Sequence, residues 1–166
     1  MKLARHLAVA LLAWLTFAAP AVARDIVPFG GYAPGTIVIY TGARALYYVT
    51  SGGQAIRYPV GVGRAGMAWH GRANIARKSL RPGWGPPADI ALANPHLPLF
   101  IPGGSPRNPM GAAAMGLSRG NYAIHGTNDP GSIGHFVSHG CIRMYNEDVL
   151  DLYGRVRVGT EVVVLR

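Results

Sequence analysis

Three short segments near the start of the chain favour a β fold. Residues 36–42 and 43–50 are rich in Ile, Val, Tyr and Thr, the residue types that are enriched in strands. The turn SGGQ follows, and residues 55–63 (AIRYPVGVG) form a third such segment that ends in glycines. Strand-like segments joined by turns this short are typical of an antiparallel meander. We therefore predict a mainly β fold whose first part is a meander over residues 36–63.

Strand signals become sparser after this meander. Residues 64–116 hold eight of the thirteen prolines and few periodic runs, so we interpret them as a Pro/Gly-rich insertion of loops and short elements. Trp69 and Trp84 lie in this insertion, where they either anchor loops in the core or form a lid over a substrate groove. Residues 122–128 (YAIHGTN) predict a strand that runs into a turn, and residues 159–166 predict a closing strand.

One helix is expected, over residues 146–156 (NEDVLDLYGRV). Asn146 suits the N-cap position, and Glu147 and Asp148 suit the positive end of the helix dipole. Four residues with helical spacing form one apolar face: Val149, Leu152, Tyr153 and Val156.

The first 23 residues have the layout of a secretory signal peptide. Lys2 and Arg5 give a positive start, residues 7–19 are almost entirely apolar, and residues 21–23 match the small-x-small cleavage pattern. The apolar run is too short for a membrane span, which needs about 20 residues. We therefore expect cleavage after Ala23 and export to the periplasm, where the protein would associate with the cell wall.

Cleavage there leaves residues 24–166, a size suited to one domain, with 24–35 as a lead-in and 36–166 as the domain proper. The whole chain has 16 Lys and Arg against 7 Asp and Glu, and loss of Lys2 and Arg5 leaves 14 against 7. In a cytosolic protein this excess of basic residues would suggest binding to nucleic acid. Outside it, anionic wall or envelope polymers fit better, and simple solubility explains the charge equally well.

The strongest candidate for chemistry is the single cysteine, Cys141, in the segment SHGCIRMY. One cysteine in an exported protein cannot form an internal disulfide, so it pairs with another molecule, stays buried or is reactive. The thiolate is the nucleophile, and a free thiol with a pKa of about 8.5 is mostly protonated at neutral pH. His125, His135 and His139 are candidate bases, and the start of the predicted helix would also favour the thiolate.

Spacing alone leaves the base undecided. In a strand, His139 and Cys141 would point to the same face, whereas His125 reaches Cys141 only if their segments pair in the fold. Gly140 permits a positive φ, which can direct amide N–H groups at an oxyanion. The alternatives are a buried inert thiol and a metal site of these histidines with Cys141. Metal is disfavoured because the spacing of His135 and His139 requires a helix, and glycines flank this segment.

The pair of motifs YAIHGTN and SHGCIRM resembles the L,D-transpeptidase catalytic domain, also called the YkuD-type domain. That family's pattern is His-Gly, a gap, and then Ser/Thr-His-Gly-Cys with Arg or Asn shortly after; residues 125–126 and 138–143 match it at every position. YPVGVGR at 58–64 is similar to the strand and turn that end the family's first meander. The resemblance covers residues 36–166 and implies a β-sandwich-like domain with a short helix after the cysteine.

The resemblance also implies roles at the site. Cys141 would be the nucleophile, His125 the proton donor and acceptor, and the backbone carbonyl of Gly126 would orient His125. Amides around His139, Gly140 and Cys141 would form the oxyanion hole.

Two further residues are implied at the substrate pocket. Ser138 and Arg143 would shape this pocket or contact a substrate carboxylate. A surface ion pair with Glu147 or Asp148 explains Arg143 equally well. His135, His70 and His96, which lie outside the motif, are interpreted as loop histidines.

The implied activity is that of an exported enzyme acting on the tetrapeptide stems of peptidoglycan. Cys141 would form a thioester, and an amine acceptor would then give a 3→3 cross-link or attach an envelope protein. No metal, cofactor or nucleic acid is expected, and carbapenem-type β-lactams would acylate Cys141. With water as acceptor, the same site would be an L,D-carboxypeptidase or endopeptidase. A third hypothesis is a non-catalytic wall-binding protein that keeps the fold.

Overall fold

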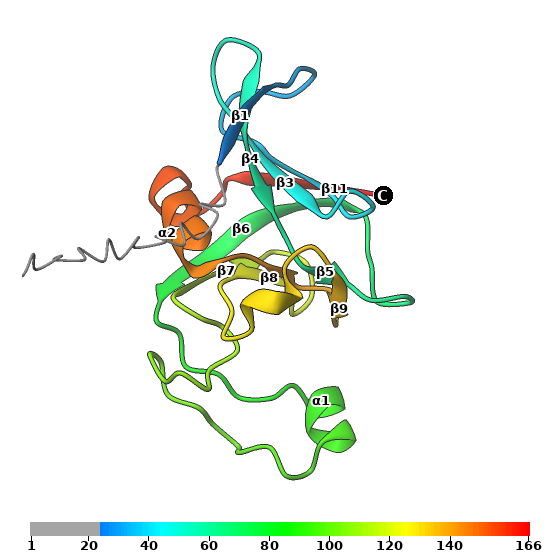
Figure 1. Ribbon diagram of the computed structural model, residues 1–166, viewed down its shortest axis with the longest axis vertical. Coiled ribbons are helices and arrows are strands. Elements are labelled where there is room, and N and C mark those ends of the chain that lie inside the picture. Colours follow the sequence, from blue (N-terminus) through cyan, green and yellow to red (C-terminus); the bar gives the residue numbers. More distant parts are fainter. Residues whose placement is uncertain (1–23) are drawn as a thin grey trace, which may run out of the picture.

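The computed structural model describes residues 24–166 (Figure 1), so the predicted signal peptide at 1–23 lies outside the described residues. The described chain forms eleven strands, two α-helices and one 3-10 turn. In chain order they are β1 (Asp25–Pro28), β2 (Ile37–Tyr40), β3 (Ala45–Val49), β4 (Gln54–Pro59), β5 (Val62–Gly63), β6 (Gly71–Leu80), α1 (Ala88–Ala93), β7 (Ala113–Leu117), β8 (Ala123–His125), η1 (Pro130–Ser132), β9 (Phe136–Ser138), β10 (Ile142–Arg143), α2 (Asn146–Arg155) and β11 (Glu161–Leu165).

Nine strands form one continuous sheet in the order β1-β4-β3-β2-β11-β6-β7-β8-β10. The meander predicted over 36–63 is confirmed, since β2, β3 and β4 are antiparallel neighbours. Its third segment, however, is not one strand. The chain leaves the sheet after β4, and β5 pairs with β9 in a separate two-stranded sheet. Gly61 makes this crossing possible, because a Cβ there would lie 2.7 Å from the carbonyl oxygen of Ser132.

Strand β6 corrects the interpretation of residues 64–116 as loops and short elements. It is the longest strand of the described chain, at 10 residues, and it joins the two halves of the sheet. Its first half pairs with β11 and its second half with β7, and the register shifts between Ile75 and Arg77. A strand with an irregularity at its middle can turn a sheet from one layer into another. Charged side chains interrupt its apolar pattern, which is why the sequence does not reveal it.

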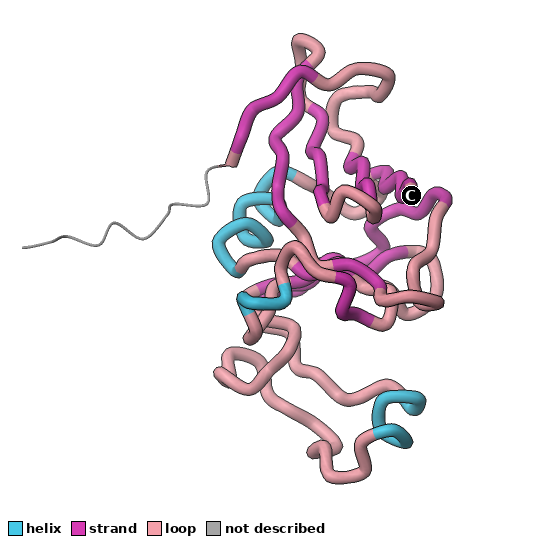
Figure 2. The backbone as a smooth tube through the Cα atoms, turned by 45° about the vertical axis from the view of Figure 1, so that its right-hand side comes forward, coloured by secondary structure: helices cyan, strands magenta, loops and turns pink. Residues whose placement is uncertain are grey.

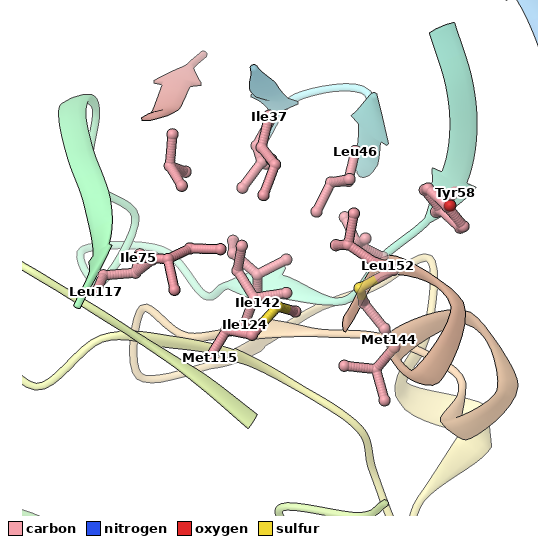
Figure 3. Packing of buried hydrophobic residues seen from close by; sticks show 14 of the residues in the cluster. Ile37, Leu46, Tyr58, Ile75, Met115, Leu117, Ile124, Ile142, Met144 and Leu152 are labelled. Atoms are coloured by element: carbon pink, nitrogen blue, oxygen red, sulfur yellow. The ribbon is translucent and has the colours of Figure 1, made fainter. Parts of the chain in front are cut away.

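The two halves of the bent sheet face each other across the hydrophobic core. Figure 3 shows Ile37 and Leu46 from the meander opposite Met115, Ile124 and Ile142 from the other half. All five side chains are buried. The β-sandwich-like fold with a helix after the cysteine is therefore confirmed.

Helix α2 covers one end of this core. Its predicted apolar face is confirmed, because Val149 and Leu152 are fully buried and Tyr153 packs against the core from the edge. The predicted N-cap is wrong: Tyr145 precedes the helix without a side-chain cap bond, and Asn146 is the first helical residue. The side-chain amide of Asn146 bonds instead to the backbone of Ala112 and Thr127.

Residues 81–112 form an arm between β6 and β7 that projects from the body of the molecule (Figures 1 and 2). The arm is mostly loop, as the sequence predicts, and α1 lies near its far end. Trp84 and Ile101 pair across it through their backbones. Leu99 is 91% exposed and Phe100 is also exposed, so the arm presents apolar side chains to solvent next to this pair. No helix within residues 24–166 is long and apolar enough to cross a membrane.

Candidate active site

The pairing of β8 with β10 brings the two sequence motifs together. These strands are parallel, with Ile142 opposite Ile124 and Arg143 opposite His125. Both isoleucines are buried in the core. Because successive side chains in a strand point to opposite faces, His125 and Arg143 point away from the core. Cys141 lies one residue before β10, and its Sγ is 3.9 Å from the carbonyl oxygen of Asn121, so the cysteine adjoins the segment that leads into β8 and His125.

His125 is a buried imidazole with one nitrogen engaged. It is 5% exposed, and its Nδ1 lies 2.6 Å from the carbonyl oxygen of Gly126. A carbonyl only accepts, so Nδ1 carries the proton and Nε2 is free to accept one. Burial lowers the pKa of His125 from 6.5 to about 4; the carbonyls of Gly126 and Pro109 offset part of this, and the charge of Arg143 adds to it. His125 is therefore neutral at pH 7 and can act as a base.

Cys141 is a partly buried thiol rather than a preformed thiolate. Burial raises its pKa, while a hydrogen bond from the backbone of Ala123 and the charge of Arg143 lower it by smaller amounts. Burial thus outweighs the hydrogen bond and the charge that favour the thiolate. A neutral thiol and a neutral imidazole can exchange a proton when a carbonyl carbon approaches.

Ser138 and Gly140 fix the turn that carries the cysteine. Buried Ser138 donates its hydroxyl to the carbonyl of Cys141 at 2.6 Å and accepts the amide N–H of Gly140 at 3.1 Å. Gly140 has φ +111, and a Cβ there would lie 2.4 Å from the ring of Tyr122. This positive φ interrupts the extended backbone, so His139 and Cys141 do not lie on one strand.

The other histidines are placed apart from this face or engaged elsewhere. His139 Nε2 lies 2.9 Å from Nη2 of Arg64, and since the guanidinium is a donor, this nitrogen accepts. Arg64 also donates its backbone N–H to the carbonyl of Ser138 at 3.0 Å. His135 is exposed in the loop before β9. Sequence reasoning missed Arg64, although it ends the motif YPVGVGR.

Trp69 contacts the same turn through its indole ring. Its indole N–H donates to the carbonyl of Gly140 at 3.0 Å, and its ring stacks on Tyr122 at 5.1 Å with an interplanar angle of 5°. The guanidinium of Arg119 also lies over the Trp69 ring, 5.3 Å from its centroid. Trp69 is buried, so the interpretation as a core anchor is the one that the structure supports for this residue.

Asn146 holds the segment that follows His125. Its Oδ1 accepts the N–H groups of Ala112 and Thr127 at 3.0 and 3.2 Å, and its Nδ2 donates to the carbonyl of Thr127 at 3.0 Å. A Cβ on Gly126 would lie 2.3 Å from this Oδ1, so only glycine fits beneath the amide. The first residue of α2 thereby positions the loop that contains the carbonyl partner of His125.

Arg143 makes no ion pair within the described residues, and Asp148 instead pairs with Arg24 at 3.0 Å. The surface ion pair considered from the sequence is therefore not formed. Arg143 lies beside both His125 and Cys141, where its charge acts on their pKa values. Within residues 24–166, no three His, Cys, Asp or Glu side chains gather as a metal site would require.

Fold and site together define a class of protein: a β-sandwich-like domain in which a neutral histidine ends one strand, β8, and a cysteine directly precedes its neighbour, β10. The sequence model of the L,D-transpeptidase catalytic domain matches residues 34–164. The probable L,D-transpeptidase YbiS of Escherichia coli is 41% identical over 135 residues, which cover 76% of this chain and 43% of that protein. The chain belongs to the L,D-transpeptidase catalytic domain family. It spans less than half the length of this relative.

Two solved structures share the fold. L,D-transpeptidase 3 from Mycobacterium tuberculosis, with a faropenem-derived adduct, has a TM-score of 0.61 at 16% identity and covers 79% of this chain and 60% of its own. A chain from Brucella melitensis described as a probable carnitine operon oxidoreductase is 44% identical, with a TM-score of 0.58 over 89% of this chain and 96% of its own. That name differs from the family of this chain, which rests on the sequence model and on YbiS.

Proposed function

We propose that this protein is an exported L,D-transpeptidase that acts on the tetrapeptide stems of peptidoglycan through a thioester on Cys141. The observation that carries the proposal is the register of β8 and β10, which sets His125 opposite Arg143, two residues after Cys141, while Ile124 and Ile142 enter the core. Membership of the family supports the donor substrate. The layout of residues 1–23 supports export to the periplasm.

In the first half-reaction, His125 Nε2 takes the proton of the Cys141 thiol as sulfur attacks the carbonyl carbon at the L-centre of diaminopimelate. The bond to the terminal D-alanine breaks, and the protonated imidazole gives that proton to the leaving amine. A thioester on Cys141 and free D-alanine result. The low pKa of His125 keeps the imidazole unprotonated at neutral pH, and it favours the second transfer, because the imidazolium form releases its proton readily to the leaving amine.

Backbone amides would stabilise the oxyanion that forms during the attack. The N–H of Gly140 already donates to Ser138, so we assign this task to the N–H groups of His139 and Cys141. Ser138 then acts by fixing the turn, since its hydroxyl is buried and used within it. The cationic side chains of Arg143 and Arg64 would attract a carboxylate of the donor stem.

In the second half-reaction, an acceptor amine attacks the thioester carbonyl and returns the thiol to Cys141. A neighbouring stem peptide as acceptor gives a 3→3 cross-link, and an amine of an envelope protein gives an attached protein. A carbapenem-type β-lactam would acylate Cys141 in the same way as the donor stem does in the first half-reaction. The β-lactam adduct of the M. tuberculosis structure supports this.

The test is mass spectrometry of the mature chain, with Cys141→Ala as control, after incubation with a carbapenem and separately with a disaccharide-tetrapeptide. A covalent adduct on Cys141 together with cross-linked dimers is the expected result. Tripeptide product without dimers would identify water as acceptor and an L,D-carboxypeptidase. If neither an adduct nor a product forms, the enzyme hypothesis is contradicted, and a wall-binding protein with the family fold remains.

A further inference from the structure

The side chain of Arg24, the first described residue, binds the N-terminal half of helix α2. Its Nε donates to Asp148 Oδ1 at 3.0 Å, and its Nη1 lies 3.3 Å from Asp151 Oδ1. Its Nη2 donates to the backbone carbonyl of Glu147 at 3.2 Å. One side chain at the start of the domain thus contacts three acceptors on the helix that follows the cysteine. This set of contacts lies outside the catalytic face.

One acceptor of this cluster has no donor. The side chain of Asp148 is 2% exposed, and its Oδ2 has no hydrogen-bond partner within the described residues. The oxygens of Asp151, by contrast, accept from Tyr58 and Arg155. Burial raises the pKa of Asp148 even though Arg24 opposes this, whereas the hydrogen bonds from Arg155 lower that of Asp151. A buried carboxylate oxygen without a donor is costly and calls for a missing partner.

The register of the first strand sets Arg24 beside a second residue that contacts helix α2. Strands β1 and β4 are antiparallel, with Asp25 opposite Arg57. One more step along this register sets Arg24 opposite Tyr58, whose hydroxyl contacts Asp151 on α2. Arg24 is thus tied to the acidic cluster by its own side chain and lies one register step from a strand residue bonded to the same cluster.

Removal of a signal peptide would change the chemistry of that nitrogen. In the uncleaved chain it is an amide without charge. Hydrolysis of the bond between Ala23 and Arg24 adds one water, leaves a carboxylate on Ala23 and frees the α-amino group of Arg24. This group becomes an ammonium with three donors at neutral pH.

We propose that Asp148 Oδ2 is a binding site for the α-ammonium of the mature N-terminus. The inference rests on the proposed export and cleavage after Ala23. It also balances charge: Glu147, Asp148 and Asp151 carry three negative charges, against two positive charges on Arg24 and Arg155. The ligand is thus a primary ammonium that the chain's own processing supplies.

This site would couple processing to the catalytic face. Helix α2 begins with Asn146, whose amide holds the loop after His125. An ammonium on Asp148, two residues further along, ties the first turn of the same helix to strand β1. The mature chain is then expected to be more stable than the precursor.

The experiment compares the thermal stability of three forms of the chain that differ only at the N-terminus. The first starts at Arg24 with a free amine, the second has this amine acetylated, and the third retains Val22 and Ala23. At pH 7 we expect the free amine to raise the Tm by about 3–5 °C over both other forms, corresponding to one buried charge-assisted hydrogen bond. The difference should vanish in Asp148→Asn and persist in the matched control Glu147→Gln.

The pH dependence identifies the group responsible. Pairing with Asp148 raises the pKa of the amine above its ordinary value of about 7.7–8.0. Its contribution is complete below that value and is lost as the pH rises through the raised pKa, so the Tm difference should close in alkaline solution. Other groups around the site keep their charge there: burial raises the pKa of Tyr58, and the carboxylates are already ionised. The titratable groups on the elements around Arg24 are Arg57 and Tyr58 of β4, Asp25 of β1, and Glu147, Asp148, Asp151 and Arg155 of α2.

Three results would overturn the proposal: equal Tm values for the three forms, a difference that survives Asp148→Asn, or N-terminal sequencing of the secreted protein that finds a start other than Arg24. If Asp148→Asn does not fold, the comparison of free and acetylated amine still decides. None of these measurements depends on transpeptidation. A chain without activity on tetrapeptides can therefore still bind its own N-terminal ammonium at Asp148. An active chain can, conversely, lack this binding.

Discussion

Replacing Trp69 by Phe tests whether the indole N–H positions the catalytic turn. Phe keeps an aromatic ring to stack on Tyr122 but removes the donor to the carbonyl of Gly140, now bonded at 3.0 Å. Gly140 is buried, so its carbonyl loses a partner that water cannot easily replace. An unsatisfied buried acceptor costs about 1–3 kcal/mol, and the smaller ring adds about 1 kcal/mol of lost packing. We expect the free energy of unfolding to fall by about 2–4 kcal/mol.

The same substitution should slow the chemistry more than it weakens binding. The turn of residues 138–141 carries the nucleophile, and a misplacement of about 1 Å can cost up to about a hundredfold in rate. We expect acylation of Cys141 by a carbapenem to slow by about tenfold or more, measured by mass spectrometry over time, alongside urea unfolding.

Trp84→Phe is the matched control. Trp84 lies on the projecting arm, and the pairing there with Ile101 is through the backbone. This variant should change the free energy of unfolding by less than about 1 kcal/mol. If Trp69→Phe behaved like Trp84→Phe in both assays, the argument that the indole fixes the turn would be refuted.

Three further predictions concern the base, the turn and its support. The rate of Cys141 acylation should fall on acidification through about pH 4, and a kinetic limb at 6.5 would contradict the burial argument. Because the unfolded chain takes up this proton near pH 6.5 and the folded chain only near pH 4, stability should fall between these two pH values, by about 3 kcal/mol in total. Gly140→Ala should abolish acylation and reduce soluble yield, because its Cβ would lie 2.4 Å from Tyr122 at a φ of +111; an active variant would show that the turn is not fixed. Asn146→Ala removes three hydrogen bonds between α2 and the loop after His125, so urea unfolding should show a loss of about 2–4 kcal/mol, whereas a loss below about 1 kcal/mol would make this amide dispensable.

Local sequence signals predicted the meander, the apolar face of α2 and the closing strand, because each depends on side-chain types within a few residues. The same signals failed for β6, whose two halves serve different layers and whose apolar residues do not alternate cleanly. They also failed for Asn146. A polar residue before a helical pattern suits an N-cap, but here its amide bonds to chain segments 19 and 34 residues away.

For the site, the sequence by itself determined the chemistry: one cysteine, a nearby histidine in a His-Gly pair, and a glycine turn before the cysteine. It left the choice among the histidines open apart from the family pattern. Only the tertiary structure sets His125 beside the strand that follows Cys141, because the register between β8 and β10 depends on both isoleucines entering one core. Burial likewise decided the protonation states. The pKa values of His125 and Cys141 follow from the loss of water around them, and the surroundings that exclude it come from segments far away in the chain.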